Sequence, residues 1–345
     1  MSYVCEHTAN TETRLKEYEI ATEVMRRPSS FDPKLDPVVR VSMMGIRDRL
    51  QRYFENTREH ERLQLVVPKG QYRAQFIETQ SQPGTELQDN AQYLKLFWGS
   101  YLAPGRSNLI VHTEPLFFRE GWETYVRNLY VNDPGKGKAA LIDRLPELGT
   151  RDLHPSFHYL DIGEVQTTFR LLEFFHELGA QVSVRNGRLV SWHEMRHSNL
   201  VLVGCPRTST YVDMLQEESN FMVMEDEIRN RLPVGGELPS YRGKRYLDAK
   251  LHRYREYVLI TRRPGAVEGS VVTMIAANHG RAIEAATTCL TSAGELEKLL
   301  RILNGNSDPL LILPKRFQIL MQVEMIDLDD EIVDVSYLSH RLTPE

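Results

Sequence analysis

A polar segment at residues 80–90 divides the chain and is the strongest constraint on how it folds. The segment holds the pair Pro83-Gly84, and Leu87 is its only large apolar residue. This composition is typical of a linker between domains. At about 100–200 residues per domain, 345 residues suffice for two domains. The sequence therefore predicts an N-terminal domain at residues 1–78, a linker at 79–92 and a second domain at 93–345.

Composition excludes several classes of protein. The sequence has no run of about 18 apolar residues, so we expect no membrane-spanning helix, and residues 1–10 do not resemble a signal peptide. The three cysteines are far apart, which argues against a disulfide framework and against a zinc site. We therefore expect a cytoplasmic protein. The net charge is −5, so nucleic-acid binding would require a local basic patch.

Residues 36–56 carry the clearest helix signal. Asp36 can cap the first turn, and Pro37 suits the first helical position. Apolar residues follow at spacings of three and four, which is typical of one buried helix face; they are Val39, Met43, Ile46, Leu50 and Tyr53. Basic residues occupy the opposite arc. An earlier, weaker pattern predicts another helix over Arg14–Met25.

The next segment, Arg62–Ile77, predicts a β-hairpin. Apolar residues alternate on both sides of the turn Pro68-Lys69-Gly70. Residues 38–73 hold eight basic and four acidic side chains, a local charge of +4 within a chain of −5. An amphipathic helix with a basic outer face, followed by a hairpin with lysine at its tip, is the plan of a winged helix-turn-helix.

Residues 15–76 resemble the winged-helix DNA-binding domain at the N-terminus of multidomain bacterial regulators. The resemblance is carried, in order, by the segments 15–20, 27–28, 31–33, 36–41, 47–50 and 65–72. Two features depart from the family pattern. Met44 and Gly45 stand where the family has more charged residues, and the domain is expected to lack its first helix.

This plan predicts which residues contact DNA. The expected contacts come from the helix and the hairpin: Arg40, Arg47, Arg49, Arg52, Lys69 and Arg73. Arginine and lysine neutralise phosphates, and arginine can also pair with guanine. The alternative is a solvated helix face whose charges pair with local carboxylates such as Glu55 and Glu59.

The second domain shows strands and helices in alternation. Strands are expected at residues 108–111, 181–184, 200–203, 221–224, 257–261 and 271–276, and in two long runs at 318–326 and 331–338. Helices are expected at residues 163–178, 191–198, 210–217 and 281–290, with another starting at Ser292. This order favours an α/β fold with a parallel or mixed sheet. The domain also faintly resembles the region that follows the winged helix in related bacterial proteins, which implies a Rossmann-like sensor domain.

Three turns at strand or helix ends are candidate ligand contacts, because open α/β sheets bind ligands where strands end. The first turn holds Gly204, Arg207, Thr208 and Ser209, which could bind a phosphate or carboxylate. The second holds Asn278, His279 and Gly280, and the third Gly163 and Glu164. The alternatives are structural: a helix cap, glycine backbone angles, and an acid that complements a helix dipole.

Other motifs fail as functional signatures. Residues 134–138 resemble a phosphate loop, but no strand precedes them, so we expect a surface loop. His193-Glu194-Met195-Arg196-His197 matches a zinc-protease motif in letters, but it lacks a long helix and a third ligand. We therefore expect neither a metal nor a cofactor.

The sequence favours a DNA-binding transcriptional regulator whose α/β domain senses a small, anionic ligand. Its partners would be double-stranded DNA, the ligand and, as a homodimer, a second copy of the chain. The alternative is a nucleotide-processing or nucleotide-responsive effector enzyme, whose winged helix serves as a protein-interaction module. Convergence of Glu164, Arg207 and His279 in one cleft would favour the enzyme.

Overall fold

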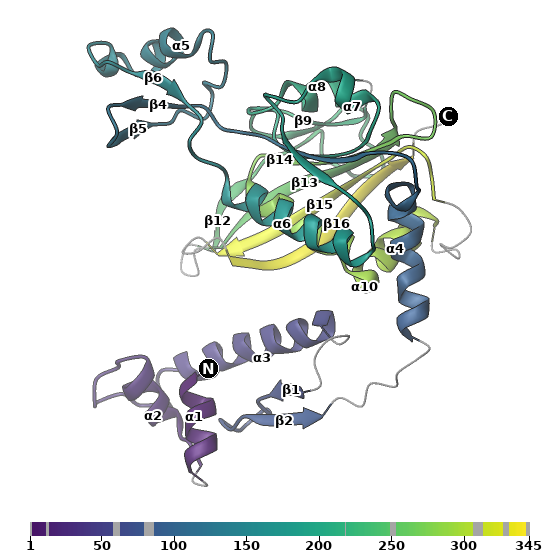
Figure 1. Ribbon diagram of the computed structural model, residues 1–345. Helices are drawn as coiled ribbons and strands as arrows, with labels where there is room; N and C mark the ends of the chain where they lie inside the picture. Colours follow the sequence, from purple (N-terminus) through teal and green to yellow (C-terminus); the bar gives the residue numbers. More distant parts are fainter. Residues whose placement is uncertain are drawn as a thin grey trace. The chain divides into compact units, whose positions relative to one another are not determined.

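A computed structural model describes residues 2–11, 14–57, 63–78, 86–217, 219–248, 253–305, 313–326 and 331–342. The chain divides into two compact units, Met1–Asp89 and Asn90–Glu345 (Figure 1). The boundary falls within the segment expected to form a linker. The predicted linker, residues 79–92, is too long, because helix α4 (Glu86–Leu102) already includes its last residues.

Unit 1 contains helices and one hairpin. Its elements are α1 (Ser2–Asn10), α2 (Glu17–Glu19), a π-helix (Ile20–Val24), α3 (Val38–Thr57), β1 (Leu63–Val66) and β2 (Gln75–Glu78). The Asp36 carboxylate accepts a hydrogen bond of 3.0 Å from Val38 N, as expected of a helix cap. β1 and β2 pair antiparallel. The predicted helix and hairpin are therefore both present.

The apolar stripe of α3 builds the core of unit 1. Val39 and Met43 are buried, while Ile46 and Leu50 pack against the core from its margin. The side chain of Tyr53, the last member of the stripe, lies outside the described residues. Spacing along the helix thus predicted which face is buried.

The start of the chain differs from its prediction. We expected no helix before Arg14, but α1 is present and inserts Val4 into the core. The single helix expected over Arg14–Met25 is instead the short α2 followed by the π-helix. A helix therefore precedes the segment in which the first helix was expected.

Unit 2 is built on an eight-stranded mixed sheet. Its strands are β3 (Asn108–His112), β7 (Ser183–Asn186), β8 (Asn199–Gly204), β12 (Lys244–Asp248), β13 (Arg253–Pro264), β14 (Val271–Ala277), β15 (Phe317–Ile326) and β16 (Glu331–Leu342). They are ordered β16-β15-β13-β14-β8-β3-β7, with β12 also paired to β13. The predicted mixed α/β class is confirmed.

Four of these strands, β7, β3, β8 and β14, run parallel. The first of them in the chain, β3, lies inside the sheet, with β7 on one side and β8 and β14 on the other. The chain leads from β3 to β7 on one side and from β8 towards β14 on the other, so a switch point lies between the carboxyl ends of β3 and β8. Strands β13, β15 and β16 add antiparallel pairing.

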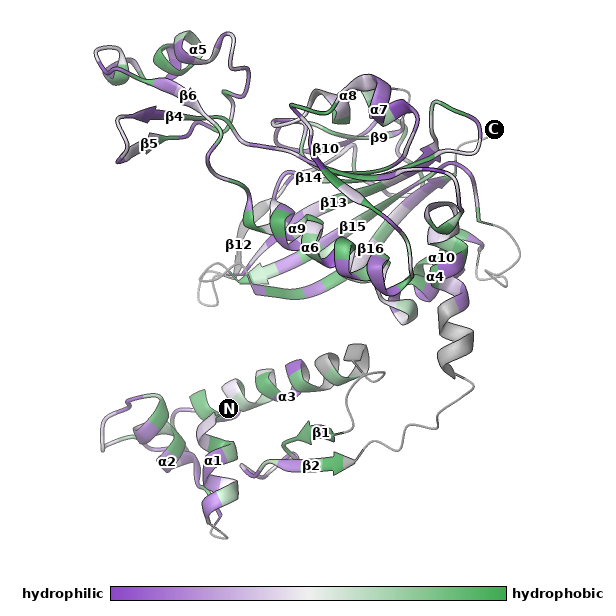
Figure 2. Cartoon of the chain, viewed as in Figure 1, coloured by the Kyte–Doolittle hydropathy of each residue, from purple (hydrophilic) through white to green (hydrophobic). Residues whose placement is uncertain are grey.

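Both faces of the sheet are covered. One face packs against α4, α6 (Ile162–Glu177), α9 (Gly280–Thr291) and α10 (Ala293–Leu303). The other packs against α7 (Trp192–Arg196), α8 (Thr210–Gln216) and a small sheet of β9 (Phe221–Val223), β10 (Ile228–Asn230) and β11 (Ser240–Tyr241). Neighbouring residues of β8 alternate between the two cores, and the central strands are strongly hydrophobic (Figure 2).

A subdomain inserted between β3 and α6 was not predicted. It consists of β4 (Phe117–Glu120), β5 (Thr124–Val126), α5 (Gly137–Arg144), a 3-10 turn (Pro146–Leu148) and β6 (His154–Ser156). It has its own apolar core, in which Phe118 and Leu141 are fully buried. The expected surface loop at residues 134–138 is wrong at its end: Gly137 begins α5, and a side chain there would lie 2.7 Å from the Phe118 ring.

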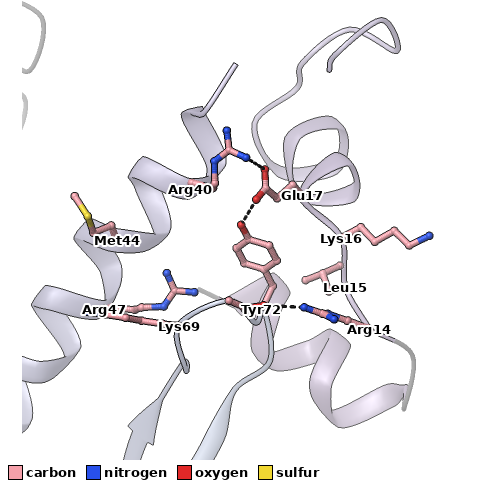
Figure 3. Close-up of a pocket in the computed structure, with 10 residues that line it drawn as sticks. Arg14, Leu15, Lys16, Glu17, Arg40, Met44, Arg47, Lys69 and Tyr72 are labelled. Atoms are coloured by element: carbon pink, nitrogen blue, oxygen red, sulfur yellow. Dashed lines mark hydrogen bonds and ion pairs between the residues drawn. The ribbon is translucent and has the colours of Figure 1, made fainter. Parts of the chain in front are cut away.

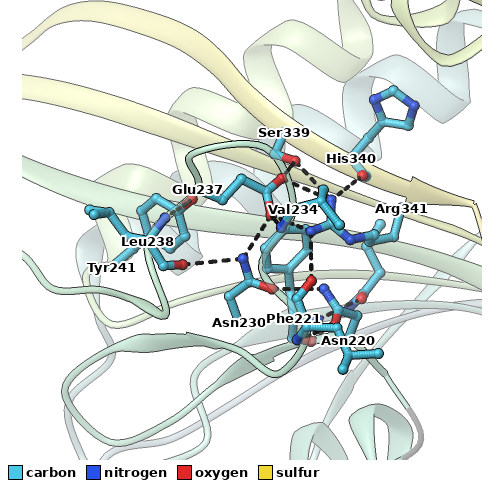
Figure 4. Close-up of polar contacts among 12 residues, drawn as sticks. Asn220, Phe221, Asn230, Val234, Glu237, Leu238, Tyr241, Ser339, His340 and Arg341 are labelled. Carbon is cyan, nitrogen blue, oxygen red and sulfur yellow. Dashed lines mark hydrogen bonds and ion pairs between the residues drawn. The ribbon is translucent and has the colours of Figure 1, made fainter.

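A partly buried ion pair fastens the loop between β10 and β11 to β16 (Figure 4). Glu237 pairs with Arg341 and accepts hydrogen bonds from Asn230 Nδ2 (2.9 Å) and Val234 N (3.0 Å). Arg341 holds the pKa of this carboxyl far below its usual range. The Arg341 guanidinium also lies 4.7 Å from the centre of the Phe221 ring. The pair therefore joins the small sheet to the edge of the large one.

Helices α6 and α9 meet at their first turns, where two glycines allow backbone contact. We expect Gly163→Ala to destabilise unit 2 by about 1–3 kcal/mol, because the added methyl would lie 2.1 Å from the carbonyl carbon of Gly280. Gly99→Ala in α4 is the control. It has open space around it and should stabilise by about 0.5–1 kcal/mol. Urea unfolding measures both; equal effects would contradict the close contact.

Candidate functional site

Unit 1 has a groove of about 790 Å³ at the junction of α2, α3 and the hairpin (Figure 3). Most of the charged side chains around it are basic. The groove is lined by Arg14, Leu15, Lys16, Glu17, Arg40, Met44, Arg47, Lys69, Gly70 and Tyr72. Five cations thus face one carboxylate. Among the described residues of unit 1, this concentration of positive charge suits a polyanion.

Glu17 holds the three elements of the groove together. Its carboxylate accepts a hydrogen bond of 2.6 Å from the Tyr72 hydroxyl and lies 3.4 Å from Arg40 Nη1 (Figure 3). Burial, reinforced by Glu17, raises the pKa of Tyr72 to about 12, so the phenol remains a donor at neutral pH. Arg40 is half-exposed. It therefore keeps part of its guanidinium open to solvent.

Arg47, predicted to face DNA, fastens the hairpin to α3. Its guanidinium donates to the carbonyls of Val67 (2.8 Å), Pro68 (3.2 Å) and Gln71 (2.9 Å). Arg14 adds a bond of 2.8 Å to the Gly70 carbonyl. These bonds fix the hairpin tip against α3. Arg47 therefore has a structural task whether or not it also contacts a partner.

The other predicted DNA contacts are distributed unevenly. Arg40 and Lys69 line the groove, whereas Arg49 and Arg73 are exposed outside it. The side chain of Arg52 lies outside the described residues. Sequence reasoning missed Arg14 and Lys16, since only the folded chain brings them to the hairpin tip.

In unit 2, polar groups gather at the switch point between β3 and β8. The Glu164 carboxylate accepts hydrogen bonds from Thr113 N (3.0 Å) and Thr113 Oγ1 (2.9 Å). Thr113 Oγ1 lies 2.6 Å from Thr208 Oγ1. Three segments, the end of β3, the first turn of α6 and the turn after β8, are thereby joined. The predicted residues Glu164 and Thr208 do come together.

Glycine permits this arrangement. Gly204 has φ of +151°, and a side chain there would lie 2.3 Å from Thr113 Cγ2. Gly163 and Gly280 touch through their backbones, and the Asp161 carboxylate occupies the space that a side chain at Gly280 would need. These three predicted glycines therefore serve packing, and Asp161 caps α6 through Gly163 N (2.9 Å).

Burial dominates the chemistry of Glu164. Its removal from water, reinforced by the nearby Asp161 charge, raises the pKa of the carboxyl to about 8, against the opposing hydrogen bonds from Thr113. The group is therefore mostly protonated at neutral pH. Beside it lies a small, mainly apolar cavity of about 150 Å³, lined by Leu160, Val165, Phe169 and Val184 among others.

Two arginines lie near the carboxyl end of β8. Arg207 Nη2 donates to the Asn278 carbonyl (2.9 Å), and its buried Nε has no hydrogen-bond partner among the described residues. Arg127 donates to uncharged oxygens, including the Leu116 carbonyl and Asn132 Oδ1. Burial lowers the pKa of Arg127, and the Arg207 charge adds to this effect. Neither guanidinium is bonded to a carboxylate within the described part of the chain.

The remaining candidates have partners within the protein. The amides of Thr208 and Ser209 both donate to the Cys205 carbonyl (3.0 and 3.1 Å), so neither points to a ligand. The Asn278 side chain, in the orientation that satisfies its amide, bonds the turn between β9 and β10. The His279 ring lies edge-on to Tyr254 at 5.9 Å.

The described part of the chain was searched for a metal-binding cluster and for a membrane-spanning helix. It contains no group of three or more His, Cys, Asp or Glu placed to hold a metal ion. Glu194 of the zinc-protease-like motif pairs with Arg185 at 2.8 Å. No helix found in the described residues has the length and apolar character needed to cross a bilayer.

Comparison of the chain with protein families, curated proteins and solved structures found no match.

The raised pKa of Glu164 predicts that the stability of unit 2 depends on pH. The carboxyl has a pKa of about 8 when folded and an ordinary value of 4.5. Between these values the folded state retains a proton that the unfolded state loses, so the free energy of unfolding should fall as pH rises from about 5 to 8. A pKa that is higher by 1 in the folded state corresponds to about 1.4 kcal/mol. Glu164→Gln keeps the hydrogen bonds and should remove this contribution.

Urea unfolding at pH 5 and pH 8.5 measures the effect. Glu164→Gln should gain stability relative to the wild type as pH rises, whereas Glu173→Gln, at an exposed position on the same helix, should not. Parallel pH profiles for the wild type and Glu164→Gln would contradict a buried, protonated carboxyl.

Proposed function

We propose that the chain is a DNA-binding transcriptional regulator in which unit 1 contacts double-stranded DNA and unit 2 senses a small anionic ligand. The observation that carries the proposal is the groove of unit 1, where cations from the segment before α2, from α3 and from the hairpin tip face one carboxylate of α2. A surface of this kind can neutralise several phosphates along one strand, and that term supplies most of the affinity in sequence-independent DNA binding.

The shape of unit 1 supports the same proposal. α3 presents Arg40 to solvent beside the groove, whereas Arg49, nine residues further on, is exposed on the opposite flank of the helix. The hairpin, fastened by Arg47, places Lys69 at its exposed tip. A helix with a basic outer face beside a rigid hairpin fits the major groove and the adjacent backbone. Met44, 58% exposed between these cations, would supply an apolar contact.

For unit 2, the ligand would bind where β3 and β8 diverge. Arg207 and Arg127 supply positive charge there, and the buried Nε of Arg207 provides a donor. Open α/β sheets bind ligands at this position. Binding would alter DNA affinity only if the ligand prefers one of two states of the protein.

The enzymatic alternative has less support. Glu164, Arg207 and His279 each contact a protein partner: Thr113, the Asn278 carbonyl and the Tyr254 ring, respectively. Because the three side chains contact other parts of the protein, their interactions serve the fold. This favours a sensor over an enzyme that performs acid–base chemistry on a nucleotide.

Salt dependence tests the DNA contact. The double variant Arg40→Gln/Lys69→Gln should weaken binding to a duplex from the protein's own upstream region. It should also lower the slope of log affinity against log salt by about 0.9 for each phosphate that the variant no longer neutralises. Fluorescence anisotropy of the full chain at several salt concentrations measures this slope.

Lys34→Gln is the matched control, because Lys34 is exposed in unit 1 but outside the groove. Arg47→Ala is unsuitable, since it would also release the hairpin. Duplex binding that is absent at low salt, or equal in the double variant and the control, would overturn the proposal for unit 1.

Inorganic phosphate tests the sensor site. At roughly a hundredfold its Kd it should raise the Tm of unit 2 by about 5 °C, because it binds only the folded state. Arg207→Gln should abolish the increase in Tm, while Arg196→Gln, at an exposed position on α7, should retain it. An equal increase in both variants would assign the effect to general salt stabilisation and contradict the site.

A further inference from the structure

The small sheet of the inserted subdomain has one open face rich in aromatic rings. We call it the aromatic face, and it comprises Phe117, Arg119, Trp122, Tyr125, His154 and Tyr159. Trp122 is 78% exposed and Tyr159 is 47% exposed. Exposed rings of this size are costly in water when they serve no contact. None of the functions proposed above uses them.

Strand pairing places these side chains together. Phe118 points into the subdomain core, so its neighbours Phe117 and Arg119 lie on the opposite face of β4. Tyr125 of β5 and His154 of β6 stand directly opposite Arg119 in the pairing register. One row across the sheet therefore holds a histidine, an arginine and a tyrosine.

The rings extend this row into a cluster in which Tyr159 stands edge-on to Tyr125 and tilted against Phe117. Tyr159 lies 5.2 Å from Phe117 and 4.8 Å from Tyr125, measured between ring centres. At the β4–β5 turn, the Arg119 guanidinium lies 4.8 Å from the centre of the Trp122 ring. Because these side chains brace one another, little further ordering is needed when a flat partner binds.

The charges of the aromatic face favour an anionic partner. Its own ionisable groups are Arg119 and His154, besides the phenols; in addition, the Arg127 guanidinium lies 6.0 Å from the centre of the Phe117 ring, and His158 Nδ1 lies 3.2 Å from the Tyr125 hydroxyl. The nearby carboxylate of Asp152 pairs with His154 at 3.1 Å, whereas Arg119 donates to the Gly121 carbonyl at 3.1 Å and lies against Trp122. Arg119 thus offers a positive charge amid stacking rings.

We infer that the aromatic face binds single-stranded nucleic acid, with unpaired bases stacked on Trp122, Tyr125 and Tyr159 and the backbone near Arg119. Stacking rings with an interleaved cation are the pattern that binds unpaired strands without reading their sequence. Duplex DNA keeps its base faces covered, so it is a poor partner for this surface. The site is separate from the groove of unit 1.

The test uses the full chain and a labelled oligothymidylate of about 12 nucleotides, within the span typical of such platforms. Anisotropy and tryptophan quenching follow binding. Trp122→Ala should weaken single-strand binding roughly 5- to 150-fold, and Trp122→Phe should restore most of it. Trp192→Ala, which removes a half-exposed tryptophan on α7, is the matched control and should bind as the wild type does.

Duplex binding separates this inference from the function proposed for unit 1. Trp122→Ala should leave duplex binding unchanged, and Arg40→Gln/Lys69→Gln should leave most single-strand binding intact. The inference is overturned if the wild type does not bind the oligonucleotide at low salt. It is also overturned if Trp122→Ala binds as tightly as Trp192→Ala, or if only the unit 1 variant loses binding.

Discussion

The hydrogen bonds between Glu164 and Thr113 are the contact on which the arrangement of unit 2 at the switch point between β3 and β8 depends. They tie the first turn of α6 to the end of β3 inside the protein, where water does not compete for either partner. Two close approaches make them possible: Gly204 leaves room for Thr113, and Gly163 lets α6 lie against α9. A side chain at either glycine would displace an element that carries one bonding partner.

Local signals predicted much of the fold, because helix caps and apolar stripes act within a few residues. Asp36 caps α3 as expected, Ser191 caps α7 at the start of the expected helix, and Gly179 follows α6 with a positive φ. Ser292 precedes α10 but makes no side-chain cap bond. The inserted subdomain was missed because its stability comes from contacts distant in sequence, such as the fit of Gly137 beneath Phe118; the same holds for the packing of α1.

The sites were harder to predict than the fold, because the interactions of a charged side chain depend on its surroundings in the folded chain. Arg40 and Arg47 are seven residues apart and share one face of α3. Arg40 keeps part of its guanidinium in solvent, whereas Arg47 meets the carbonyls of the hairpin. Glu164 was recognised as a first-turn acid, but its burial depends on Thr113, and sequence spacing does not reveal that pairing.

The two nucleic-acid surfaces proposed for this chain would obtain their affinity from different physical terms. In the groove of unit 1, affinity would come from cations that displace counterions, so it would fall steeply as salt rises. On the aromatic face, stacking would contribute most, and stacking changes much less with salt because no counterions are released. A regulator with both surfaces could therefore bind an unpaired strand at salt concentrations that weaken its binding to duplex DNA. The chain's net charge of −5 is compatible with this, because each surface depends on its own local groups.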